Sequence, residues 1–161
     1  MNQVAIFEVS FERNQGLIVR ETEGLTDAES VLQLPFESNC MNWVLGHLAV
    51  YRDALLGCTR QQPRLSAAER GLYIQGAPPI TSESEAVPLE RLLAAVAEGF
   101  EALGVWLQNN PEGLLEETPP GLELSFGATV AENFALLCWH DSYHVGQLAV
   151  LRELALSRRG E

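Results

Sequence analysis

The sequence has no long hydrophobic run and no basic N-terminal segment. Across its 161 residues, no apolar stretch approaches the roughly 18 residues that a membrane-spanning helix requires. The opening residues, MNQVAIFEVSFER, place the acidic Glu8 early and lack the basic start of a secretory signal peptide. These two absences predict a cytoplasmic protein with no membrane-spanning segment.

Positive charge is scarce as well. Ten basic residues face 22 acidic ones, so the formal net charge is −12. A surface of this sign repels nucleic acid phosphates and anionic lipid head groups. The Arg158-Arg159 pair near the C-terminus is too short to form a basic patch. We therefore expect no nucleic acid partner and no membrane partner, and we interpret most of the carboxylates as solvated helix faces.

Cysteine is also sparse, with only Cys40, Cys58 and Cys138 in the chain. The number is odd and no Cys-x-x-Cys motif occurs, so neither a disulfide framework nor a zinc ribbon is indicated. On a helix, Cys138 lies about 200° around the axis from His140, which makes it an unsuitable partner for a metal bound there. We interpret all three thiols as small core or surface side chains.

What the sequence does contain is helical periodicity. Hydrophobic residues make up 47% of the chain, which is typical of a globular protein. Capping boxes at 26–29 and 129–132 mark two helix starts, and Gly24 is a plausible stop. With little strand signal, the pattern predicts an all-α fold, a four-helix bundle in one domain over residues 1–161. The long helices are expected at 4–23, 40–56, 88–108 and 129–156.

Two of the predicted connections are long. The one at 57–87 is expected to hold a short helix at 66–73, followed by a break at Ala77-Pro78-Pro79. A connection of this length is either a crossover along the bundle or a lid over a site. Tyr73 and Ile74 in it could contact a ligand or simply pack. The segment 109–127 is irregular, with an alternating stretch at 122–126 that could be extended.

The last predicted helix carries two of the three histidines, His140 and His144. Four residues on a helix turn about 400°, so both imidazoles lie on one face, one turn apart. The same face also carries Asn133, Leu136, Gln147 and Leu151. It is mostly apolar, so we expect it to point inward. Inward imidazoles either hydrogen-bond to backbone or water, or bind a metal such as zinc, nickel, iron or copper.

The third histidine, His47, lies in the predicted helix at 40–56. Asn39 or Ser38 can cap this helix, and Gly57 can close it. At about 100° per residue, His47 shares its face with apolar positions. These are Cys40, Trp43, Val44, Tyr51 and Ala54, whereas Asn42, Arg52 and Asp53 fall on the far side.

All three histidines are therefore expected to face one core, which favours a coordination set over three unrelated buried groups. Three protein ligands leave a fourth position open, which is the pattern of a catalytic rather than a structural zinc site. Gln147 could hydrogen-bond a metal-bound water, support a ligand or simply be buried. Asp141 and Tyr143, about 60° off the ligand stripe, are candidates for a general base.

Two other metal chemistries fit poorly. The stretch from His140 to His144 resembles the protease motif H-E-x-x-H. However, Asp replaces Glu in it, and only 17 residues follow His144 to supply a third ligand. A di-iron carboxylate bundle needs two Glu-x-x-His motifs, and the chain contains none. The sequence thus disfavours both.

Two motifs together resemble the DinB/YfiT-like superfamily. They are Asn42-Trp43-x-x-Gly46-His47 and His140-x3-His144-x-Gly146-Gln147, and the resemblance extends over nearly the whole chain. It implies a four-helix bundle in up-up-down-down order, often dimeric. It also implies that His47, His140 and His144 hold a divalent metal, commonly zinc or nickel.

The resemblance further implies an activity on a small-molecule substrate. Characterised members include transferases and isomerases that use low-molecular-weight thiols such as bacillithiol, mycothiol or glutathione, whose thiolate a metal would stabilise. We therefore expect a metal-dependent thiol S-transferase, or a hydrolase of a small substrate, that forms a homodimer. The alternative is a non-catalytic, stress-related bundle that binds a metal or an apolar ligand and acts as a dimer.

Overall fold

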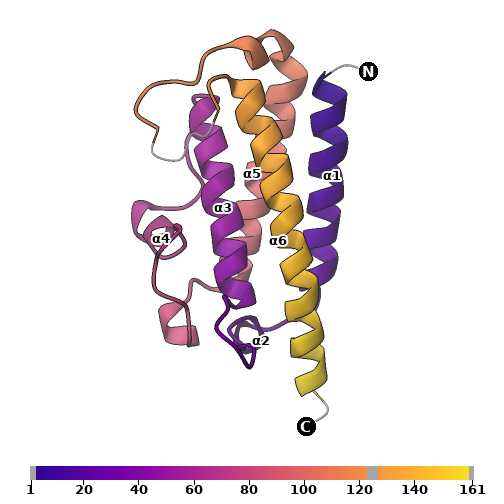
Figure 1. Ribbon diagram of the computed structural model, residues 1–161, viewed down its shortest axis with the longest axis vertical. Helices are drawn as coiled ribbons and strands as arrows, with labels where there is room; N and C mark the ends of the chain where they lie inside the picture. The colour runs from indigo at the N-terminus through magenta and orange to yellow at the C-terminus, as the bar shows by residue number, and fades with distance from the viewer. Residues whose placement is uncertain (1–2, 123–126, 160–161) are drawn as a thin grey trace.

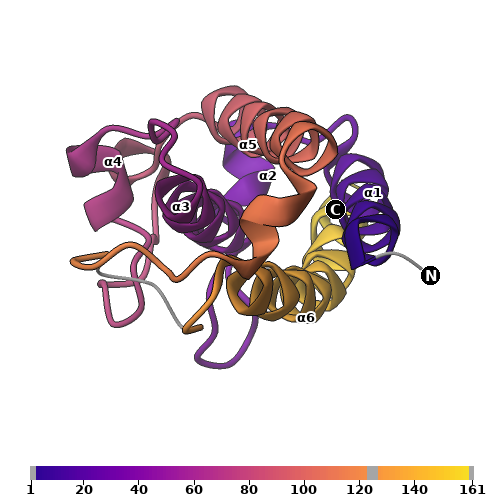
Figure 2. The same cartoon turned by 90° about the horizontal axis from the view of Figure 1, so that it is seen from above.

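The computed structural model describes residues 3–122 and 127–159, and within these ranges the chain forms a four-helix bundle (Figure 1). Its long helices are α1 (Gln3–Thr22), α3 (Met41–Cys58), α5 (Leu89–Asn109) and α6 (Val130–Arg158). Seen from above, they form a ring in which α1 packs on α6, α6 on α3, α3 on α5, and α5 on α1 (Figure 2). The all-α, four-helix bundle predicted from the periodicity is confirmed.

The direction of the helices follows from the lengths of the connections. In Figure 1, α1 runs downward, α3 and α5 run upward, and α6 runs downward again. The link through α2 (Asp27–Ser30) stays at the lower end of the bundle, so α1 and α3 are antiparallel, whereas the long connection after α3 brings the chain back to the bottom before α5 begins. The order in the chain is thus down-up-up-down, and it becomes up-up-down-down only when read from α3.

The capping boxes predicted at 26–29 and 129–132 are confirmed, and a third forms at Ser66, where only a short helix was predicted. The side chains of Thr26, Ser66 and Thr129 accept hydrogen bonds from the third residue of α2, α4 (Ala67–Gly71) and α6, and a glutamate returns the bond in each case. Gly24, just past α1, has a φ of +71°, the left-handed conformation that ends a helix. Elsewhere, the loops contain short 3-10 turns at Glu83–Glu85 and Pro111–Leu115.

The start and end of α3 differ from the prediction. The N-cap residue is Cys40 rather than Asn39 or Ser38, and its side chain makes no capping hydrogen bond to the described residues. The helix also continues through Gly57 to Cys58 instead of closing there. Tertiary packing over the whole length of α3 supports these ends, because nearly every residue of the helix is buried.

The polar residues expected on an exposed side of α3 are buried, which corrects the helical-wheel interpretation. α3 packs on α5, on α6 and on the connection that follows it, so it has no broad solvent face. Asn42 donates a hydrogen bond to the Val87 carbonyl. The Asp53 carboxylate accepts the backbone N–H groups of the next loop, from Arg64 at 2.6 Å and Leu65 at 2.9 Å.

Arg52 joins all four long helices in the middle of the bundle. Its guanidinium donates to Asp141 Oδ2 of α6 at 2.9 and 3.2 Å, to Gln15 Oε1 of α1 at 2.6 Å, and to the Val96 carbonyl of α5 at 2.7 Å. The side chains of Arg52 and Asp141 are both fully buried. A buried charge needs such partners because it has lost its hydration.

The remaining connections cover the ends and one side of the bundle. An isolated antiparallel bridge joins Glu117 to Thr129 beside the start of α6. The predicted extended stretch at 122–126 lies largely outside the described residues. Within the described ranges, no helix is both long and apolar enough to cross a bilayer.

Candidate metal centre

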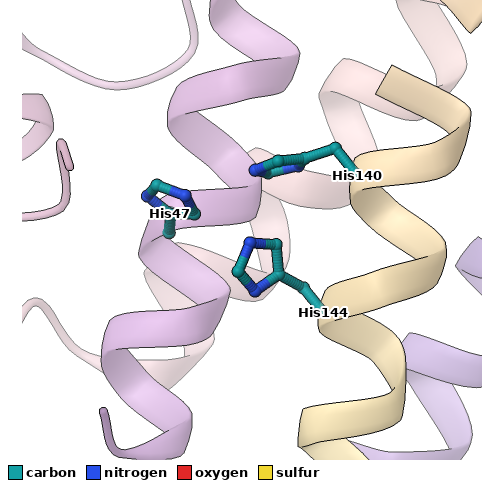
Figure 3. Close-up of side chains that lie close together, drawn as sticks. All are labelled: His47, His140 and His144. Atoms are coloured by element: carbon teal, nitrogen blue, oxygen red, sulfur yellow. The ribbon is translucent and has the colours of Figure 1, made fainter. Parts of the chain in front are cut away.

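The three histidines converge between α3 and α6. His47 projects from α3 toward His140 and His144 on α6, and one nitrogen from each ring lies within 4.8 Å of the other two (Figure 3). The ring centroids are 4.4–5.1 Å apart. The face of α6 that carries the histidines was expected to point into the core. It lines a cavity instead, and Leu136 on the same face is 39% exposed.

A backbone carbonyl fixes the orientation of His47. Nδ1 of this ring lies 2.7 Å from the Tyr73 carbonyl oxygen, and both groups are buried. A carbonyl only accepts hydrogen bonds, so Nδ1 carries the hydrogen and Nε2 keeps its lone pair in the neutral ring. Trp43, one turn earlier on α3, stacks on the same imidazole at 4.6 Å. His47 is thereby held in the tautomer whose Nε2 lone pair is available to a metal.

Gln147 plays the corresponding part for His144. Nδ1 of His144 lies 2.7 Å from Gln147 Oε1, three residues along the same helix. With the amide oxygen as acceptor, the hydrogen again sits on Nδ1 and leaves Nε2 free. Gln147 therefore contacts one of the three histidines directly, and its role toward a metal remains a prediction.

His140 differs from the other two because its polar atoms are unsatisfied. Both ring nitrogens are buried, and neither has a hydrogen-bond partner among the described residues. The ring stacks on Tyr51 at 4.0 Å, and Nδ1 lies 3.7 Å from Asp141 Oδ1, beyond hydrogen-bond distance. Burying an imidazole in this way is unfavourable unless another group binds it.

Tyr73 contacts or fits against three of the four motif residues at the start of α3. Asn42 accepts a hydrogen bond from the Tyr73 hydroxyl at 2.8 Å, and that hydroxyl accepts the N–H of Val87. Gly46 leaves room for the ring, since a Cβ there would lie 2.2 Å from Tyr73 Cγ. The Tyr73 carbonyl then accepts from His47. Tyr73 is fully buried, so of the two roles considered for it, packing is the observed one.

Burial keeps two of the imidazoles neutral. Desolvation lowers the pKa of His47 to about 4 and also lowers the pKa of His144 below its ordinary value. Neighbouring imidazoles add to both shifts, because a second positive charge would be repelled. Neutral imidazole is the form that binds metal ions, so these two rings are ready ligands at pH 7.

A cavity of about 490 Å³ opens beside the three rings. Its walls come mainly from α3 and α6, and Gln75 of the long connection also contributes. Apolar and aromatic side chains dominate the lining, among them Trp43, Tyr51, Leu55, Leu136, Trp139 and Tyr143. A volume in the range of roughly 300–1,000 Å³ is typical of small-molecule sites.

Comparison with known families agrees with this geometry. The family model of the DinB superfamily matches residues 10–148. The chain belongs to the DinB superfamily. No curated protein matches it. In this DinB-superfamily protein, the matched region includes all three histidines, and the three-histidine cluster fits a metal-binding site.

The remaining candidates of this DinB-superfamily protein occupy different places. Asp141 does not line the cavity; it is fully buried and pairs with Arg52, which favours a structural role. Tyr143 does line the cavity and is 59% exposed. Cys58 reaches the cavity wall, but burial raises the pKa of its thiol. Cys138 points elsewhere, and burial raises its pKa to about 12.

Sequence reasoning did not predict that two aromatic rings stack on the imidazoles. Trp43 stacks on His47, and Tyr51 stacks on His140 across the helix interface. Both rings were assigned to the apolar face of the helix. Their spacing of four residues on either side of His47 was the available signal, because such positions share a helix face.

Proposed function

We propose that the protein is a divalent-metal-dependent enzyme in which His47, His140 and His144 hold the ion through imidazole nitrogens. The observation that carries this proposal is His140, which is buried with both nitrogens unpaired among the described residues. Its two neighbours each commit Nδ1 to an acceptor and keep Nε2 free. An ion held between the three rings would bind one nitrogen of His140 together with the free Nε2 atoms of His47 and His144.

Three histidines would leave one coordination position for a substrate. Zinc and nickel both suit imidazole ligands. An ion bound here supplies a Lewis acid that lowers the pKa of a bound thiol or water. We infer the transfer of a small thiol to an electrophile, or hydrolysis of a small molecule, as the reaction. Tyr143 and Gln147 are two of the polar side chains at the cavity that could hydrogen-bond to the substrate.

Metal analysis tests the proposal directly. The purified protein should contain about one equivalent of zinc or nickel, or take it up at micromolar concentration. His140→Ala should abolish uptake, whereas Cys138→Ala, which removes a thiol of the same helix that does not line the cavity, should leave it unchanged. Wild-type protein that binds no divalent ion under these conditions would refute the metal site.

The second candidate function is a non-catalytic bundle that binds a metal or a ligand. The observation in its favour is that no carboxylate lines the cavity among the described residues, so the site has no strong general base. A panel of thiols and electrophiles separates the two. Turnover that disappears with His140→Ala supports the enzyme, and metal binding without turnover on any pair supports the binding protein.

A further inference from the structure

The walls of the cavity beside the three histidines carry no fixed charge. Apart from the imidazoles, the described residues that line it are aromatic, aliphatic, amide or thiol side chains, without an aspartate, glutamate or arginine. The nearest carboxylate in the sequence, Asp141, is turned into the core and bound by Arg52. A ligand in this cavity therefore finds no ionic partner on the described wall.

The cations of the chain are engaged elsewhere. The sequence has no lysine, and its ten basic residues are all arginines. Arg52 is buried in the core network, Arg91 binds Glu69, and Arg159 binds Glu29 on the far end of the bundle. None of the ten lines the cavity within the described part of the chain. With a net charge of −12, the molecule as a whole also repels anions.

Aromatic side chains line both the buried part of the cavity and the part that opens to solvent. Trp43 and Tyr51 are almost fully buried at its inner wall. Trp139 and Tyr143 on α6 line it at the solvent side, where they are 67% and 59% exposed and lie nearly parallel with centroids 6.2 Å apart. Exposed aromatic side chains beside an apolar cavity favour flat, apolar ligands, which bury ring surface against them.

We propose that this cavity binds uncharged, largely apolar organic molecules with a flat or aromatic part, and discriminates against anionic ones. A carboxylate on the cavity wall away from the three histidines would lose its hydration and gain neither an ion pair nor an arginine fork. This inference rests on the proposed function in one respect, that the ligand in the cavity is the substrate that meets the metal. If the substrate is a thiol, the inference favours a thiol whose remaining groups are uncharged. It disfavours glutathione, which carries two carboxylates.

Two fluorescent probes with the same ring skeleton test the preference. N-phenyl-1-naphthylamine is neutral, and 8-anilino-1-naphthalenesulfonate adds one sulfonate to it. The neutral probe should bind the metal-free, full-length protein at least tenfold more tightly than the anionic one. Equal affinities, or tighter binding of the sulfonate, would overturn the proposal.

Two arginine substitutions on α6 locate the effect. Leu136→Arg puts a cation on the cavity wall at a partly exposed position, so it should weaken the neutral probe and tighten the sulfonate at least fivefold. Val150→Arg adds the same charge to an exposed position of α6 outside the cavity, and should change neither affinity. A Val150→Arg effect as large as that of Leu136→Arg would show that the probes bind elsewhere, and would refute the assignment.

A matched pair of thiols connects the preference to the metal. On zinc-loaded protein, benzyl mercaptan should displace the neutral probe at a lower concentration than 4-(mercaptomethyl)benzoate does. If the protein binds no zinc, the proposed function fails while the two naphthyl probes still decide the nature of the cavity. If zinc binds but the carboxylate makes no difference, the metal site stands and the neutral-ligand assignment is wrong.

Discussion

Gln147 and Tyr73 each hold one imidazole by its Nδ1 atom, so the free lone pairs of His144 and His47 depend on residues that bind no metal themselves. Gln147→Ala should lower zinc affinity on the order of 10–100-fold, because His144 loses its tautomer and ring orientation. Chelator competition measures this change. Gln147→Glu keeps an acceptor oxygen and should stay near wild type; equal affinities in all three proteins would mean that Gln147 does not support the ligand.

Gly46 permits the contact between Tyr73 and α3. In Gly46→Ala the new Cβ would lie 2.2 Å from Tyr73 Cγ, so the ring must move and the protein should lose about 1–3 kcal/mol of unfolding free energy. Zinc affinity should fall as well, since the Tyr73 carbonyl orients His47. Urea unfolding and chelator competition measure the two effects.

Gly16→Ala is the matched control for that substitution. Gly16 is exposed on α1, and no atom of the described residues lies within 4 Å of a Cβ built there. Alanine should stabilise this helix by about 0.5–1 kcal/mol. If both glycine variants had the same stability, the close approach of Tyr73 would not be the reason for Gly46.

For single residues, the sequence predicts which side chains meet better than it predicts which backbone atoms they contact. The spacing of His140 and His144, and the apolar neighbours of His47, were sufficient to predict that the three imidazoles meet. The Tyr73 carbonyl could not be predicted, because any residue offers a carbonyl and only the fold brings that one to His47. Arg52 was placed on an outer face for a related reason, since periodicity does not show how many neighbours a helix has.

Among the helices, the C-terminus of α6 is tied to the short helix α2. Glu29 accepts hydrogen bonds from the backbone of Thr26 at 2.8 Å and from Arg159 Nη2 at 2.9 Å. The bond from Arg159, followed by that from Thr26, lowers the pKa of Glu29 from 4.5 to about 2. A carboxyl whose folded pKa is lowered stabilises the fold above its unfolded pKa, and this contribution is lost as the pH falls through the folded value.

Glu29→Gln tests this link between α2 and α6. The variant should melt at a lower temperature than wild type at pH 7, and the gap should shrink progressively as the pH falls from about 4.5 toward 2. Thermal unfolding across this range gives the measurement. A gap that stays constant with pH would show that the charge of Glu29 contributes nothing.

Element boundaries were predictable where they depend on neighbouring residues. The capping boxes at Thr26, Ser66 and Thr129 involve residues only three positions apart, so their sequence signatures are local. The ends of α3 depend instead on packing against α5, α6 and the following connection. For that reason Gly57 does not stop the helix, although glycine often does.

Across the whole molecule, the buried pair of Arg52 and Asp141 joins helices that are distant in sequence. Asp141→Ala should cost about 3–5 kcal/mol of unfolding free energy, because it leaves a fully buried guanidinium charge without its partner. Arg52→Met combined with Asp141→Leu removes both charges and should be more stable than Asp141→Ala. Urea unfolding of Arg52→Met, of Asp141→Leu and of the double variant distinguishes a buried pair from two independent side chains, whose effects on the unfolding free energy would simply add.

The arrangement of the helices is the part that the sequence pattern alone leaves open. Apolar stripes predict four helices but do not say which faces meet, and the expected up-up-down-down order matches the structure only when it is read from α3. The decisive feature is the connection after α3, whose length allows α3 and α5 to run parallel. Its role as a crossover was one of the two readings considered for it.

That connection also divides the histidines into two groups, with His47 before it and His140 and His144 after it. A break near the exposed Gly76 would give one piece containing α1 and α3 and another containing α5 and α6. The helices of one piece pack against those of the other, since α1 contacts α6 and α3 contacts both α5 and α6. The two halves, produced separately, should therefore reassemble, and zinc or nickel should tighten their association, which would make the split protein a sensor for the ion.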